Sequence, residues 1–163
     1  MFKKNTLTNT WKLIICILIC QSVGIFSALA TASQNNVWFN QLILPFWQPP
    51  SYLFAPVWTI LYFLMAISLW IIWKSDTDEI IKNQACLIFA LQLFLNFWWS
   101  ILFFNIHSPE FAFFDIVLML IVIGITIFRF SRISKTAAWL LVPYILWVCF
   151  ATILNFRIIQ LNN

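Results

Sequence analysis

The chain has 163 residues, of which 63% are hydrophobic and only 9% are charged. These values lie far outside the range of water-soluble domains and indicate an integral membrane protein, with the length of a single domain over residues 1–163. The formal net charge of +4 comes from nine Lys and Arg residues. Because almost all of them flank apolar segments, they report membrane topology and exclude a basic surface for RNA or DNA.

The first apolar segment, residues 13–32, is long enough to cross a hydrocarbon core of ~30 Å as a helix. Lysines precede it and a small-residue sequence from Ser27 to Ala32 ends it, two features that also occur in cleavable signal peptides. Because cleavage would remove the first helix of the bundle, we expect the segment to be kept as a span.

The connection over residues 33–50 contains no charged residue but holds Trp38, Phe39, Trp47 and three prolines. Such a composition indicates a segment that lies at the membrane interface or folds over the bundle. We expect it to act as a lid, and the alternative is a short amphipathic connector.

The second span is expected over residues 51–73. Two prolines before it preset the first helical turn, and Pro56 removes a backbone donor, which predicts a kink. Phe54, Trp58 and Tyr62 follow a spacing of four and therefore share one helical face. This face either lines a site for a flat apolar ligand or takes part in ordinary bundle packing.

The third span is expected over residues 84–104, after an acidic linker that suits a helix start. Gln92, Asn96, Trp99 and Phe103 form one stripe along it. A buried carboxamide needs partners, so these amides either bond to neighbouring helices or orient a ligand in a pocket.

The fourth span is expected over residues 111–130, because Ser108-Pro109-Glu110 is a favourable helix start. Asp115 lies just inside this span. An ionisable group in a span suggests function by default, but near the helix N-terminus we favour a structural role.

The fifth span is expected over residues 136–159 and contains Pro143. Tyr144, Trp147, Ala151 and Asn155 share one face of it. This face resembles those of the second and third spans, since each presents aromatic rings beside one or two polar groups.

These spans predict an all-α membrane protein with a five-transmembrane-helix bundle whose sequential helices are antiparallel neighbours. The basic residues lie at the span ends that share one side of the membrane, and Arg157 alone lies on the other side. The positive-inside rule therefore predicts a cytoplasmic N-terminus and an outside C-terminus. We expect the membrane to be a bacterial cell membrane.

The inventory of reactive residues excludes several functions. The chain has one histidine, His107, whereas a bis-histidine haem site and an HExxH protease need two. The four cysteines lie in apolar spans, which indicates that they are small buried hydrophobic residues, so we expect no metal site. No conventional catalytic apparatus is visible, and a lone Asp115 argues against coupled transport.

Three stretches, residues 47–66, 95–104 and 137–156, resemble the TspO/MBR family, the tryptophan-rich sensory proteins whose animal members are the translocator protein or peripheral-type benzodiazepine receptor. The resemblance extends to the Trp38-Phe39-x-x-Leu42-x-x-Pro45 pattern in the first loop and covers nearly the whole chain. It implies a five-helix bundle, often a homodimer, with a pocket that the first loop caps.

The resemblance also implies the ligands: porphyrins such as protoporphyrin IX, haem, sterols and benzodiazepine-type drugs. It places Trp58, Asn96, Trp147 and Ala151 in the pocket. Trp58 and Trp147 also match tryptophans implicated in light- and oxygen-dependent porphyrin breakdown. Adding the residues on the same faces gives a predicted ligand-binding set of Phe54, Trp58, Tyr62, Asn96, Trp99, Phe103, Tyr144, Trp147 and Ala151.

Several positions depart from the family pattern. Ala55 replaces a glycine, Phe39 a tyrosine and Leu44 a common lysine, which weakens polar contacts from the loop to porphyrin propionates. Phe156 stands where a sterol-recognition motif needs tyrosine, and Arg157 lies too close to it.

The leading hypothesis is a membrane sensor or regulatory protein that binds a tetrapyrrole and requires no cofactor. No axial ligand is evident in the spans, so we expect metal-free porphyrin to bind at least as well as haem. The alternatives are photo-oxidative porphyrin breakdown through Trp58 and Trp147, and transport of porphyrin or sterol.

Overall fold

The computed structural model describes residues 8–31 and 38–162, and over these residues the chain is helical, with no strand. Five segments in this part of the chain are long and apolar enough to cross a membrane. The prediction of an all-α, five-span membrane bundle is therefore confirmed. The long helices are α1 (Asn9–Thr31), α2 (Phe54–Trp73), α3 (Glu79–Ser100), α4 (Pro109–Ile133) and α6 (Val142–Asn162).

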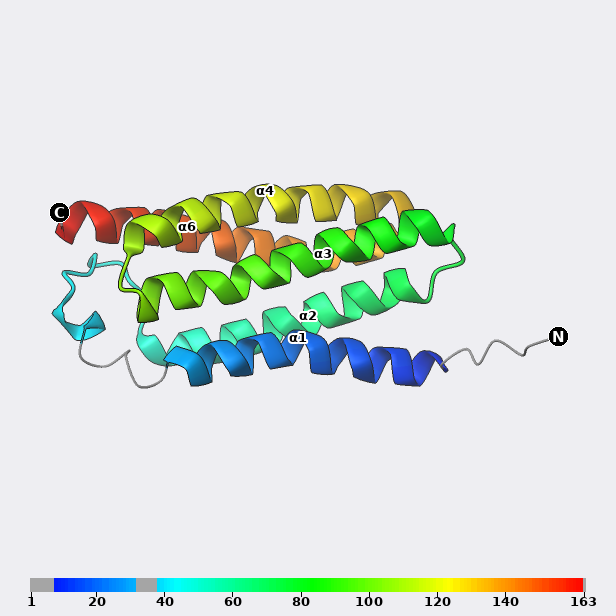
Figure 1. Cartoon of the computed structure of the whole chain (residues 1–163), viewed down its shortest axis with the longest axis horizontal. Helices are drawn as coiled ribbons and strands as arrows, with labels where there is room; N and C mark the ends of the chain where they lie inside the picture. Colours follow the sequence, from blue (N-terminus) through cyan, green and yellow to red (C-terminus); the bar gives the residue numbers. More distant parts are fainter. Residues whose placement is uncertain (1–7, 32–37, 163) are drawn as a thin grey trace.

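The helices run side by side along the long axis of the molecule (Figure 1). Helix α1 packs on α2, α3 packs on α4, and α4 also packs on α6, as expected for antiparallel neighbours along the chain. The contact between α2 and α3 is smaller, and α3 also touches α1. Stacked rings of Phe89 and Phe130, 5.7 Å apart, hold α3 against α4 in the core.

The helix starts follow from local chemistry. The Asp78 carboxylate accepts hydrogen bonds from the backbone N–H groups of Ile80 and Ile81, at 2.8 and 3.3 Å, and so caps α3. This cap explains why α3 begins at Glu79, five residues before the predicted start. Pro109 occupies the first turn of α4, where its missing N–H costs nothing.

Proline shapes two helices in different ways. Pro143 cannot donate to the carbonyl four residues earlier, and the fifth span is accordingly divided at Leu141 into the short helix α5 (Lys135–Leu140) and α6. Helix α2 is continuous from Phe54, so Pro56, where a kink was predicted, does not interrupt it. A short 3₁₀ turn, η2 (Ser51–Leu53), precedes α2, so that Pro56 falls in the first helical turn, where no donor is needed.

A π-helical turn, η3 (Ile101–Asn105), continues α3 and was not predicted. The N–H of Ile106 donates to the carbonyl of Ile101 at 3.0 Å, which is the i→i+5 pattern. His107 follows with a positive φ of 55°, a left-handed conformation that few non-glycine residues adopt. The chain thereby turns sharply from α3 into α4.

The helix ends and connections that carry most of the basic residues meet at the end of the bundle where α1 begins and α2 ends (Figure 1). There the Lys74 ammonium lies 3.4 Å from the centroid of the Trp70 ring, and the Lys12 ammonium lies 5.9 Å from the centroid of the Trp73 ring. The loop before α2 lies at the opposite end, beside the end of α6. Lys3, Lys4 and the first part of that loop, residues 32–37, lie outside the described residues.

Candidate functional site

A cavity of about 920 Å³ lies at the end of the bundle away from the basic side chains. Its walls come from α1, α2, the junction of α3 with η3, and α6, while Ile116 and Met119 of α4 contribute from the far side. The loop over residues 38–50, which we call the covering loop, supplies Phe39, Leu44 and Gln48 to the same space. The volume of the cavity is in the range of small-molecule binding sites.

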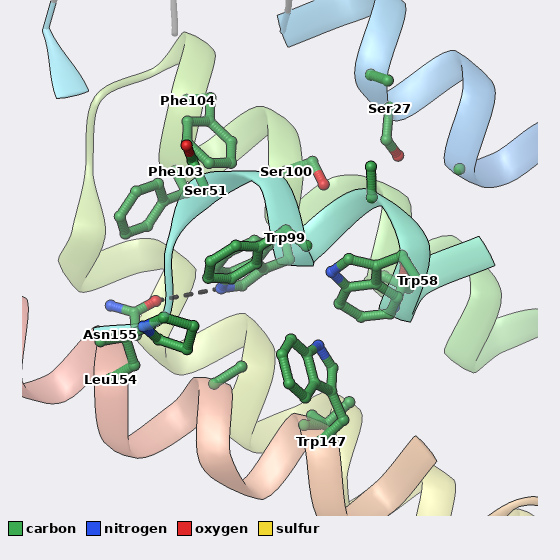
Figure 2. Close-up of a pocket in the computed structure, with 18 of the residues that line it drawn as sticks. Ser27, Ser51, Trp58, Trp99, Ser100, Phe103, Phe104, Trp147, Leu154 and Asn155 are labelled. Atoms are coloured by element: carbon green, nitrogen blue, oxygen red, sulfur yellow. Dashed lines mark hydrogen bonds between the residues drawn. The ribbon is translucent and has the colours of Figure 1, made fainter. Parts of the chain in front are cut away.

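Three indole rings from three different helices border this space (Figure 2). Trp58 comes from α2, Trp99 from α3 and Trp147 from α6. Trp58 stacks on Tyr62 with ring centroids 5.5 Å apart, and Trp147 meets Phe54 edge to face at 5.8 Å. Such rings offer large flat apolar surfaces for a flat ligand.

The Asn96 amide is held between two tyrosines at the bottom of the cavity. The Tyr62 hydroxyl donates to Asn96 Oδ1, and Asn96 Nδ2 donates to the Tyr144 hydroxyl at 3.3 Å. Tyr144 then donates to the Met119 sulfur at 3.6 Å. These bonds satisfy the buried amide within the bundle. The sequence left two roles open for Asn96, bonding to neighbouring helices and orienting a ligand. The structure shows the bonds to neighbouring helices.

Asn155 links α6 to two other helices. The Trp99 Nε1–H donates to Asn155 Oδ1 at 3.2 Å, and Asn155 Nδ2 donates to the Pro109 carbonyl at 2.8 Å (Figure 2 shows the first bond). Asn155 is only 1% exposed; its bond to the Pro109 carbonyl is buried, and its bond from Trp99 is partly buried at the cavity wall. They fix the orientation of the Trp99 ring at the cavity wall.

The π-helical turn places Phe103 and Phe104 on the cavity side of the α3 and η3 junction. The covering loop packs on these rings, with Phe39 at 6.3 Å from Phe103 and 5.8 Å from Phe104, centroid to centroid. Trp38 stacks on His107 at 4.7 Å. The loop therefore lies over the cavity, and aromatic contacts hold it there.

A side chain of α6 also ties the covering loop to the bundle. Asn162 Oδ1 accepts from the Ile43 N–H at 2.9 Å, while Asn162 Nδ2 donates to the Ile43 carbonyl at 3.0 Å. One carboxamide thus pairs with both backbone groups of one residue, as a neighbouring strand would. This contact joins positions 119 residues apart and was not predicted.

The structure brings most of the predicted ligand-binding residues to one cavity. Its lining includes Phe54, Trp58, Tyr62, Asn96, Trp99, Phe103, Trp147 and Ala151. Tyr144 is different, because it is fully buried behind Asn96 and supports it by hydrogen bonding. Gln92 and Asp115 are also buried but do not line the cavity.

Sequence reasoning missed the contribution of α1, where Gln21, Gly24, Ile25, Ser27 and Ala28 line the cavity. The one available signal was Gly24, since the chain has only two glycines. A Cβ atom at position 24 would lie 2.6 Å from Tyr62 Cε2, so glycine is what lets the Tyr62 ring lie against α1.

The described residues include no cluster of three or more His, Cys, Asp or Glu side chains that could hold a metal ion. Cys16 and Cys20 are buried as predicted, and Cys86 is partly buried. The prediction was wrong for Cys149, which is exposed on the outer face of α6. The lipid-facing surface of a helix is as apolar as the core of the bundle, so the sequence pattern alone does not tell which of the two a cysteine faces.

The five apolar spans and the aromatic cavity between the helices define a multi-pass helical membrane protein with a site at one end of the bundle. The chain belongs to the TspO/MBR family, whose family model matches residues 16–161.

Three relatives show how far this similarity extends. The tryptophan-rich protein TspO of Chlorobaculum tepidum is 42% identical over 150 residues, covering 92% of this chain and 95% of the relative. The protein of the same name from Archaeoglobus fulgidus is 40% identical over 156 residues, covering 94% and 99%. The translocator protein of Ovis aries is 35% identical over 129 residues, covering 77% and 75%. The family resemblance read from the sequence is confirmed.

Proposed function

We propose that this protein binds a tetrapyrrole, with protoporphyrin IX as the test ligand, and acts as a membrane sensor or regulatory protein. The observation that supports this most is the convergence of Trp58, Trp99 and Trp147 on one cavity of about 920 Å³. Burial of a flat macrocycle among such rings gains both apolar area and ring stacking, worth roughly 0.5–1.5 kcal/mol per pair beyond the area.

The proposed contacts are the predicted residues that line the cavity: Phe54, Trp58, Tyr62, Asn96, Trp99, Phe103, Trp147 and Ala151. Tyr144 holds Asn96 in place. The covering loop closes over the ligand as a lid. Sterols and benzodiazepine-type drugs are further candidates for the same space.

We place the protein in a bacterial cell membrane with the basic end of the bundle in the cytoplasm, following the positive-inside rule. The cavity and its covering loop then face the outer side. The homodimer that the family resemblance implies remains a prediction.

A titration of tryptophan fluorescence tests the binding function. The purified protein is titrated in the dark with protoporphyrin IX, in parallel with Trp147→Phe and with Trp139→Phe. Trp139 is 71% exposed on α5 and does not line the cavity, so it controls for the loss of one indole. Saturable quenching that weakens only in Trp147→Phe supports the proposal, whereas unsaturable quenching that is the same in all three proteins contradicts it.

Light-dependent breakdown of the bound porphyrin, with molecular oxygen as the oxidant, is the second candidate. The observation that favours it is that Trp58 of α2 and Trp147 of α6 both line the same cavity (Figure 2). Each indole would lie against a porphyrin that fills the space. Illumination of the titrated samples distinguishes this activity from binding alone.

A further inference from the structure

The cavity has no Asp, Glu, Lys, Arg or His among its described lining residues. Its polar groups are amides, hydroxyls and indole N–H groups. The covering loop adds none either, because residues 32–50 contain no Asp, Glu, Lys, Arg or His in the sequence. The absence of charge therefore extends through the part of the loop that the structure does not describe.

Few charged groups are available near this end of the bundle. Arg157 points away from the cavity lining on the exposed side of α6, where its guanidinium donates to the Gln160 side-chain oxygen at 2.9 Å. Glu110 is exposed near the start of α4 and has the wrong sign for a carboxylate ligand. The helix ends that carry the other basic residues, between α2 and α3 and between α4 and α5, lie at the opposite end of the bundle. An ionised carboxylate inside the cavity would thus lose its hydration without meeting a cation among the lining residues. His107, which stacks on Trp38 of the covering loop, lies outside this lining.

The cavity instead offers neutral hydrogen-bonding groups. Trp147 Nε1 is a buried donor and Gln48 Oε1 a buried acceptor, and neither has a partner among the residues that the structure describes. Both residues line the cavity. A buried donor or acceptor without a partner is costly. Because the two atoms themselves are inaccessible in the structure, a ligand that supplies a carbonyl acceptor and a neutral N–H or O–H donor relieves them after a change of side-chain rotamer.

We propose that the cavity selects its ring ligand in an uncharged form, as a tetrapyrrole whose carboxyl side chains are esterified in preference to the free diacid. This inference rests on the proposed tetrapyrrole binding. An ester keeps the carbonyl oxygen that can accept from Trp147 Nε1–H, and the ring N–H groups remain available as donors. The ester differs from the diacid mainly in having no charge to desolvate.

Protoporphyrin IX and its dimethyl ester provide the test. Each is titrated in the dark against the full-length protein in lipid nanodiscs, with tryptophan quenching as the readout. Partitioning of each compound into protein-free nanodiscs is measured first, and Kd is expressed as a mole fraction in the lipid, so that the greater lipid solubility of the ester does not count as binding. We expect the ester to bind about tenfold tighter or more. Equal binding, or tighter binding of the diacid, would overturn the inference.

A cation introduced into the lining gives the reciprocal test. Leu44 is partly buried and lines the cavity from the covering loop, so Leu44→Lys places an ammonium within reach of a bound carboxylate. Ile43→Lys adds the same charge one residue earlier, at a side chain that is 60% exposed and outside the lining. We expect Leu44→Lys to shift the preference toward the diacid by about tenfold and Ile43→Lys to leave it unchanged.

The outcomes separate this inference from the proposed function. If neither porphyrin gives saturable quenching, tetrapyrrole binding itself is wrong and the inference falls with it. If the diacid binds saturably and at least as tightly as the ester, tetrapyrrole binding stands and only the preference for an uncharged ligand is rejected. The same rejection follows if Leu44→Lys and Ile43→Lys change the preference equally.

Discussion

The indole of Trp99 donates a hydrogen bond to Asn155 at 3.2 Å, joining α3 to α6 beside the cavity. Asn155 Nδ2 in turn donates a hydrogen bond to the Pro109 carbonyl of α4 at 2.8 Å. One buried amide thus connects three helices at the end of the bundle where the cavity lies. Its removal would affect both the stability of the bundle and the orientation of a ring that lines the cavity.

We therefore expect Asn155→Leu to destabilise the protein by about 1–3 kcal/mol, because the Trp99 N–H and the Pro109 carbonyl lose their partner in a buried place. Thermal unfolding in detergent measures the effect. Phe156→Leu, at a neighbouring and 46% exposed position, should change stability much less. Equal melting temperatures for Asn155→Leu and the wild type would show that the pair contributes nothing.

The two glycines of the chain are expected to respond in opposite ways to alanine. A methyl group at Gly24 would lie 2.6 Å from the Tyr62 ring, so Gly24→Ala forces Tyr62 away from α1 at a cost of about 1–3 kcal/mol. Gly124 has no atom within 4 Å of its Cβ position, and alanine there should stabilise α4 by about 0.5–1 kcal/mol.

Thermal unfolding of the two alanine variants checks this contrast. Because Tyr62 also donates to Asn96, Gly24→Ala should alter the tryptophan emission of Trp58, which stacks on Tyr62. The addition of Tyr62→Leu to Gly24→Ala should remove the clash, so the two changes should be non-additive. Similar losses in Gly24→Ala and Gly124→Ala would contradict the assigned contact.

The covering loop is expected to loosen when its tie to α6 is cut. Asn162→Ala removes both hydrogen bonds to the Ile43 backbone, so amide exchange at Ile43 should speed up by about tenfold. Asn162→Asp keeps an acceptor for the Ile43 N–H and should fall between the alanine variant and the wild type.

Hydrogen exchange followed by mass spectrometry measures this change. Gln160→Ala serves as the control, since Gln160 lies two residues before Asn162 on α6 and its side-chain oxygen accepts a hydrogen bond from the exposed Arg157. Unchanged exchange of the loop in Asn162→Ala would mean that the aromatic contacts of Phe39 and Trp47 hold the loop by themselves.

If the bound porphyrin is broken down in light, Trp58→Phe should slow its bleaching several-fold, because the indole is more readily oxidised than a phenyl ring of similar shape. Absorbance of protoporphyrin IX under constant illumination in air measures the rate, with dark and oxygen-free samples as references. Trp139→Phe, far from the cavity lining, should bleach at the wild-type rate. Equal rates in all three proteins would remove the enzymatic candidate and leave binding.

The sequence by itself determined the five spans and much of the cavity lining. Apolar segments of sufficient length must be helices in a membrane, where backbone groups find no other partners. The spacing of Phe54, Trp58 and Tyr62 sets a shared face through the helical period alone. Family similarity then selected Trp58, Asn96, Trp147 and Ala151, all of which line the cavity.

Only the tertiary structure decided which faces meet. In a membrane every apolar helix face is equally compatible with lipid, so hydrophobic pattern does not specify helix contacts. Gly24 reaches the cavity because α1 packs on α2, and Tyr144 lies behind Asn96 because their hydroxyl and amide pair across two helices. The π-helical turn at Ile101–Asn105 and the tie from Asn162 to Ile43 likewise depend on contacts between distant segments, which local sequence rules do not contain.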